Sequence, residues 1–92
     1  MSGSKWFIVP AGVRLREETQ DHVLVYFEEN GYETNAVGAW LIERVRTSKQ
    51  TISSLCESVC KEFDAPPEQV KPDVEAIAAE FVRIGIFQET ES

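Results

Sequence analysis

The hydrophobic pattern of this chain changes its period near Asn35, and that change constrains the fold more than any other feature. Before Asn35, one short segment alternates apolar and charged residues and a second is rich in β-branched and aromatic residues, as is typical of β-strands. After it, apolar residues recur at the three- and four-residue spacing of amphipathic helices. The 92 residues suffice for one domain with one core. We therefore expect an α+β domain in which the strands come first.

Three short antiparallel strands are expected before this point. Residues 13–18 alternate apolar and charged side chains, and residues 22–27 are rich in β-branched and aromatic side chains. Asn30-Gly31 then predicts a two-residue hairpin loop, because both central residues of a type I′ turn need a positive φ. This loop would place Phe27 opposite Thr34, and residues 32–35 would form the third strand.

Three helices are expected after the strands. Asn35 suits the N-cap of the first helix, which should end near Arg46. Thr51 can cap the second helix, whose buried stripe ends at Phe63.

The third helix is expected to begin at Pro72. Pro66-Pro67 interrupts the chain, since paired prolines do not fit inside a helix, and residues 67–71 would then form a single turn. Proline is well suited to the first helical position, and Gly85 is a typical residue after a helix end.

The two ends of the chain are expected to lie outside the main domain. Residues 1–9 are interpreted as a loose arm, part of which lies against the body, and residues 89–92 as a polar tail. The domain would span residues 10–88. The predicted fold is α+β and winged-helix-like, with three N-terminal antiparallel strands followed by three helices.

The charge of the chain favours some partners over others. The net charge of −7 disfavours non-specific nucleic-acid binding, which depends on lysine and arginine displacing counterions. A charged partner would therefore be basic, although the charge could also serve only to keep a small protein soluble. No apolar run is long enough to span a membrane, and the N-terminus lacks the pattern of a secretory signal, so we expect a cytoplasmic protein.

The sequence carries no catalytic or metal-binding signature. His22 is the single histidine. Cys56 and Cys60 are four residues apart in an expected helix, where Cβ atoms lie about 5–6 Å apart, whereas a disulfide needs about 3.5–4.5 Å. A structural zinc site needs about four ligands. We therefore expect no enzyme activity, no cofactor and no metal.

A candidate binding surface lies between the third strand and the third helix. If this strand is at a sheet edge, its unpaired N–H and C=O groups can accept an added strand, and Thr34→Pro should remove one such donor. The apolar side chains of the helix cover roughly 160°, more than the ~100° stripe of a core-facing helix. The excess favours a groove beside this helix. Alternatively, the alanines of this helix have no binding role, and the N-terminal arm covers its remaining apolar side chains.

Several segments in a fixed order resemble the PqqD-like family over residues 10–88. Thr34 stands where the family usually has leucine, and residues 47–49 replace its usual Asp-Gly-like turn. The segments that carry the resemblance are Val23-Leu24-Val25-Tyr26-Phe27-Glu28-Glu29, Gly31-Tyr32-Glu33-Thr34-Asn35, Gly38-Ala39-Trp40-Leu41-Ile42, Thr51-Ile52-x-x-Leu55, Asp73-Val74, Phe81 and Gly85-Ile86-Phe87.

The resemblance implies a non-catalytic peptide chaperone, a recognition element for ribosomally made precursor peptides in peptide natural product biosynthesis. It would hold the leader segment as an added strand and present the rest to a modifying enzyme such as a radical SAM protein, a cyclase or a leader peptidase. Carried over to this chain, Glu33 and Glu80 could pair with basic leader residues. The implied site comprises Tyr32, Glu33, Thr34 and Asn35 on the strand, with Val70, Val74, Ile77, Ala78, Glu80 and Phe81 beside it.

Other functions remain open at this stage. A winged-helix DNA-binding or transcription-related domain would need a basic recognition helix, yet the third helix carries three acidic residues against Arg83 alone. An accessory subunit could bind its enzyme without binding a leader. An open strand edge would also allow the chain to form a homodimer.

Overall fold

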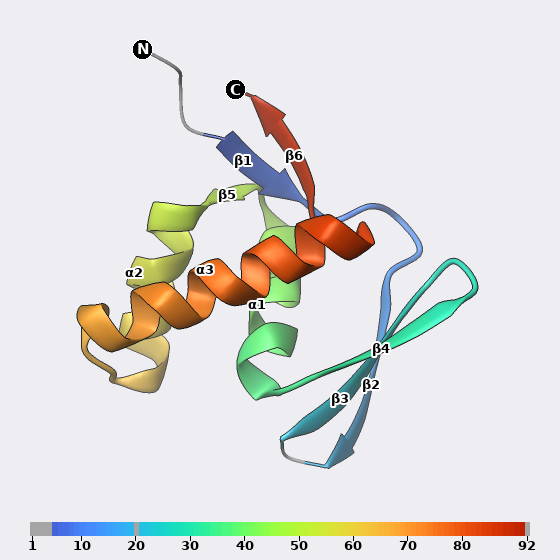
Figure 1. The fold of residues 1–92 in the computed structure, drawn as a ribbon, viewed down its shortest axis with the longest axis horizontal. Helices are drawn as coiled ribbons and strands as arrows, with labels where there is room; N and C mark the ends of the chain where they lie inside the picture. The colour runs from blue at the N-terminus through green and yellow to red at the C-terminus, as the bar shows by residue number, and fades with distance from the viewer. Residues whose placement is uncertain (1–4, 20, 92) are drawn as a thin grey trace.

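The computed structural model describes residues 5–19 and 21–91, which form two small sheets and three helices (Figure 1). Three antiparallel strands followed by helices confirm the predicted α+β class, although "winged-helix-like" describes the arrangement only loosely. In chain order the elements are β1 (Lys5–Ile8), β2 (Arg14–Thr19), β3 (His22–Phe27), β4 (Asn30–Thr34), α1 (Ala36–Thr47), β5 (Gln50–Thr51), α2 (Ile52–Phe63), α3 (Pro67–Ile84) and β6 (Gln88–Glu91).

The hairpin between β3 and β4 forms, but its turn lies two residues earlier than predicted. Phe27 pairs with Asn30, so the loop is Glu28-Glu29, with Glu28 in the left-handed region at φ 59°. The predicted Asn30–Gly31 loop is therefore wrong. That loop would leave few residues to pair before Asn35 caps α1, whereas the observed turn lets all five residues of β4 pair with β3.

The first two helices begin where their caps predict. The Asn35 side chain accepts a hydrogen bond from the Gly38 amide at 2.9 Å. At the start of α2, Thr51 and Ser54 form a capping box in which each side chain accepts from the other residue's amide. Both caps satisfy amides that have no partner within the helix.

The third helix is longer than predicted, because it begins at Pro67 and continues through Pro72. Pro67 occupies the first turn, where a missing N–H costs nothing. Pro72 lacks one hydrogen bond to the preceding turn. Buried Val70 and Val74, on either side of Pro72, hold this part of the helix against the core. Their packing offsets the lost bond, so the turn expected separately at residues 67–71 is the start of the same helix.

A second sheet, which the sequence did not predict, joins the two ends of the described chain. Its order is β5-β1-β6, with β1 antiparallel to both neighbours. Phe7 drives this arrangement, because it is only 7% exposed and stacks on Phe87 with ring centroids 5.4 Å apart. Parts of the expected arm (1–9) and polar tail (89–92) are therefore paired strands. The limits of a recognition domain at residues 10–88 stay a prediction.

The core lies where the three helices meet β3 and the small sheet (Figure 1). No helix in the described part of the chain is both long and apolar enough to cross a membrane. The largest fully buried side chains are Phe87, Leu41, Ile42, Leu55, Ile86, Val23, Val25 and Val74.

Candidate functional site

The outer edge of β4 is unpaired among the residues that the structure describes. The sheet order is β2-β3-β4, and no strand within residues 5–19 and 21–91 pairs with the other side of β4. The pair that closes a two-residue hairpin is hydrogen-bonded, and such pairs alternate along an antiparallel ladder. Tyr32 and Thr34 therefore bond to β3, and the amides of Gly31 and Glu33 face outward. The Thr34 amide, which we expected at the edge, is paired with Val23 instead.

The end of β4 is held close to α1 and α3 through Gly38. A β carbon built at Gly38 would overlap the Thr34 hydroxyl and would lie 3.3 Å from Cζ of Phe81. Because glycine has no such atom, α1 can pack directly against the strand and the third helix. This contact fixes where the free edge of β4 ends relative to α3.

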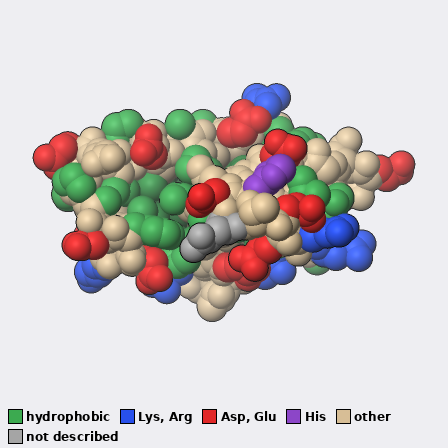
Figure 2. Space-filling model, turned by 90° about the horizontal axis from the view of Figure 1, so that it is seen from below, with side chains coloured by type: hydrophobic (Ala, Val, Ile, Leu, Met, Phe, Trp, Pro, Cys, Tyr) green, Lys and Arg blue, Asp and Glu red, His purple; other side chains and the backbone are tan. Residues whose placement is uncertain are grey.

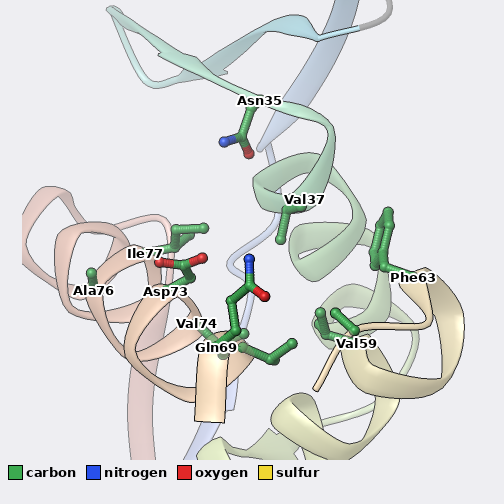
Figure 3. Close-up of a pocket in the computed structure, with 11 residues that line it drawn as sticks. Asn35, Val37, Val59, Phe63, Gln69, Asp73, Val74, Ala76 and Ile77 are labelled. Carbon is green, nitrogen blue, oxygen red and sulfur yellow. The ribbon is translucent and has the colours of Figure 1, made fainter. Parts of the chain in front are cut away.

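A cavity of about 420 Å³ opens where β4 ends, between the start of α1, the end of α2 and the first half of α3 (Figure 3). In Figure 3, Val37 projects from α1, Phe63 from α2, and Ile77 and Asp73 from α3 around this space. The lining residues are Asn35, Val37, Val59, Phe63, Ala65, Gln69, Val70, Asp73, Val74, Ala76 and Ile77.

The walls of the cavity suit a large apolar side chain. Most of its lining is aliphatic or aromatic, and the polar groups of Asn35, Gln69 and Asp73 are few. Phe63 is 41% exposed and stands edge-on to Trp40 with ring centroids 5.8 Å apart. An apolar pocket with a few polar groups is the usual form of a binding site. The Asp73 carboxylate at the cavity would favour a ligand that carries a basic group next to the apolar side chain that enters the cavity.

The predicted site residues fall into two groups on α3. Val70, Val74 and Ile77 line the cavity, together with Asn35. Ala78 is only 1% exposed and belongs to the core.

Phe81 and Glu80 lie outside the cavity lining. Phe81 is 4% exposed, and its ring meets Phe87 edge-on with centroids 5.1 Å apart. Glu80 is exposed and forms an ion pair with Arg83, one turn further along the same helix. The hydrogen bond from Arg83 lowers the pKa of the Glu80 carboxyl. A peptide contact by either residue stays a prediction.

The strand residues differ in their surroundings. Tyr32 is half-buried and packs against the core. Glu33 is exposed, and its carboxylate lies 3.3 Å from Nε2 of His22 on the neighbouring strand. Thr34 is half-buried beside Gly38. Of the four predicted strand residues, only Asn35 reaches the cavity.

The wall of the cavity that α1 and α2 supply was not predicted from the sequence. Phe63 was assigned to the buried stripe of the second helix, and neither Val37 nor Asp73 was assigned to the site. Their periodicity gave no sign that they meet, since this depends on how three helices cross. The missed lining residues are Val37, Val59, Phe63, Ala65, Gln69, Asp73 and Ala76.

The surface around the site is apolar and acidic rather than reactive. Figure 2 shows hydrophobic side chains gathered over the half of this face that the helices occupy, with acidic side chains around them. Within the described residues, no group of three potential metal ligands occurs.

Burial, with the Glu75 carboxylate as a lesser cause, raises the pKa of the Cys56 thiol. A raised pKa makes this cysteine a poor nucleophile at neutral pH.

The sheet leading directly into a helical bundle defines a small α+β domain with a known counterpart. It is similar to the solution NMR structure of the PqqD truncation of Methylobacterium extorquens PqqCD, with a TM-score of 0.70, 18% sequence identity and coverage of 90% of this chain and 88% of that chain. That protein is described as a functional and stand-alone recognition element for ribosomally synthesized and post-translationally modified peptides.

The family model of coenzyme PQQ synthesis protein D (PqqD) matches residues 21–86. This chain therefore belongs to the PqqD family, which confirms the resemblance found in its sequence. No curated protein matches the chain.

Proposed function

We propose that this chain is a non-catalytic leader-peptide-binding module of a pathway that makes a modified ribosomal peptide. It captures an extended segment of the precursor by strand addition to β4 and presents the remainder to a modifying enzyme. A radical SAM protein, a cyclase or a leader peptidase would be such an enzyme. The observation that carries the proposal is the unpaired edge of β4 ending at an apolar cavity.

The edge supplies affinity that does not depend on the peptide's sequence. The amides and carbonyls of Gly31 and Glu33 face away from β3 and can exchange hydrogen bonds with an added backbone. Five residues of β4 offer roughly 17 Å of edge at 3.3–3.4 Å per residue. A peptide that pairs along this edge and continues for a few residues beyond Thr34 would pass Asn35 and reach the cavity.

The cavity supplies selectivity. Alternate side chains of an added strand point to the same face, so one side chain near the end of the strand can enter the space between Val37, Phe63 and Ile77. A large aliphatic or aromatic residue would bury the most apolar surface there, at about 25 cal/mol per Å². The proposed peptide therefore carries one such anchor in its leader segment.

Membership of the PqqD family and similarity to a recognition element support this reading over DNA binding. The exposed charges of α3 also oppose contact with phosphates, since its acidic residues outnumber its basic ones. The acidic residues are Glu68, Asp73, Glu75 and Glu80, and the basic ones are Lys71 and Arg83. A recognition helix for DNA would carry basic groups in their place.

The same edge could pair β4 with a second copy of the chain. Peptide and second copy would then compete for Gly31 and Glu33, so peptide binding would dissociate the dimer. Sedimentation velocity with and without peptide separates a dimer of this kind from one formed elsewhere.

Calorimetric titration with a synthetic leader peptide, encoded beside this chain's gene, tests the proposal. We expect saturable binding of one peptide per chain, and no binding of a scrambled peptide of equal composition. Equal binding of both peptides, or no binding of either, would overturn the proposed function.

A further inference from the structure

A second hollow lies on the opposite flank of α3. It has a volume of about 350 Å³ and shares no lining residue with the first cavity. It lies between α3, the start of α2 and the small sheet that joins the chain ends. The lining residues are Phe7, Ile52, Glu75, Ala78, Ala79, Val82 and Glu89.

The chemistry of this hollow is unlike that of the first. Its apolar lining comes from Phe7, Ile52 and small or aliphatic side chains of α3, and its ionisable residues are two glutamates. Glu75 stands on α3 and Glu89 on β6, so a carboxylate comes from each of two walls. A ligand that fills it must be apolar along its length and cationic at its end.

The two carboxylates are free enough to receive a cation. Glu75 takes part in no ion pair among residues 5–19 and 21–91. The side chain of Glu89 is 41% exposed and has only a long contact of 3.8 Å to Nζ of Lys5, which is 62% exposed. Exposed pairs of this kind contribute little to stability, so a ligand can readily replace Lys5.

An open strand edge runs beside the hollow. In the order β5-β1-β6, the outer side of β6 has no strand partner within the described residues. Phe7 and Glu89 are paired across β1 and β6, so their side chains share the face that meets α3. A strand added to β6 would point every second side chain toward the hollow.

We propose that this hollow is a second docking site, which takes a lysine or arginine side chain from an extended basic segment of a partner protein. The segment adds to β6, the methylenes of the basic side chain lie over Ala79 and Val82, and its charged group lies between Glu75 and Glu89. Long cationic side chains bury their stems in this way while their heads stay at the surface. The net charge of −7 favours the approach of such a segment.

The two flanks of α3 can be occupied together, because their lining residues differ. A peptide held at β4 and a partner held at β6 would then be bound to one helix at once. The proposal for β6 does not depend on the peptide site, and each can fail alone.

Amide chemical shifts of the ¹⁵N-labelled chain test the second site, with a capped hexapeptide of alternating valine and lysine as the probe. We expect saturable shifts at Ala79, Val82 and Glu89, with binding that weakens as salt is added. A matched peptide with glutamine in place of lysine should bind at least tenfold more weakly. Equal binding of the two peptides, shifts confined to Asn35 and Ile77, or no saturable shift would each overturn the proposal.

Charge-neutral variants complete the test. Glu75→Gln combined with Glu89→Gln should weaken the lysine peptide at least tenfold. Glu68→Gln, which removes an exposed carboxylate of α3 outside the hollow, should leave its binding within about twofold. An equal loss of affinity in the double variant and in Glu68→Gln would show that only the overall charge attracts the probe. That result would contradict a specific site at the hollow. Amide spectra of the variants report directly whether each is folded.

Discussion

Gly38 of α1 and Thr34 of β4 approach so closely that position 38 has no room for a β carbon. The same imagined atom would lie 3.3 Å from the Phe81 ring of α3. This contact joins the strand that offers a free edge to the two helices that help to build the cavity. The geometry of the proposed site therefore depends on a residue that would touch no peptide.

Gly38→Ala should destabilise the fold by about 1–3 kcal/mol, the usual cost of overpacking a close contact. Chemical denaturation followed by circular dichroism measures it. In a Thr34→Ala background the hydroxyl is gone, so the same substitution should cost less. An equal cost in both backgrounds would show that the Thr34 contact does not matter.

Glu33→Pro should abolish strand addition and leave the chain folded. The Glu33 amide faces away from β3, so proline removes a donor to the peptide but no bond of the sheet. Peptide titration should show at least a tenfold loss of affinity. Glu33→Ala is the matched control, since it removes the same carboxylate and keeps the amide. If both variants lost affinity equally, the side chain rather than the backbone would be the contact.

Ile77→Trp should fill the cavity from within and block the peptide's anchor. Ile77 is half-buried and lines a space of about 420 Å³, so the larger ring can be accommodated without displacing the core. We expect affinity to fall at least tenfold while the unfolding midpoint changes little. Ile77→Leu keeps the volume and should bind as the parent does. Unimpaired binding by the tryptophan variant would mean that the anchor lies elsewhere.

Phe7→Ala should cost about 3–5 kcal/mol, the range for removing a buried aromatic ring. The expected loss follows from the stacking of Phe7 on Phe87 in the core. Ile8→Ala, on the same strand but 37% exposed, should stay within about 0.5 kcal/mol of the parent, as most surface substitutions do. If the two variants were equally stable, β1 would not be an integral part of the fold.

Local chemistry made the strands of the first sheet and the starts of the first two helices largely predictable from the sequence. Asn35 and Thr51 cap helices because their side chains can reach nearby amides, which needs no distant contact. The hairpin turn was misplaced because Asn-Gly is the stronger local signal, and only the pairing of β4 with β3 favours Glu28-Glu29. The small sheet was missed for a similar reason, since β1 finds its partner β6 at the far end of the chain.

The candidate site was predictable only in part. The surplus of apolar positions on the third helix indicated a groove, and Val74 and Ile77 from that surplus do line the cavity. Val70, which also lines it, was implied only by the family resemblance. Ala78 and Phe81 lie on the buried side of the same helix. The sequence could not separate these residues from those that line the cavity, because core burial and a groove produce the same helical periodicity. The α2 wall depends on the crossing of α2 and α3, which side-chain spacing does not encode.

Site-resolved amide hydrogen exchange can establish whether a bound peptide pairs with the outer edge of β4. In the free chain, the outward amides of Gly31 and Glu33 should exchange rapidly, while the amide of Thr34, bonded to β3, should already be protected. Saturation with the leader peptide should then protect Gly31 and Glu33 strongly and change Thr34 little. Saturating peptide that leaves both outward amides unprotected would contradict strand addition at β4.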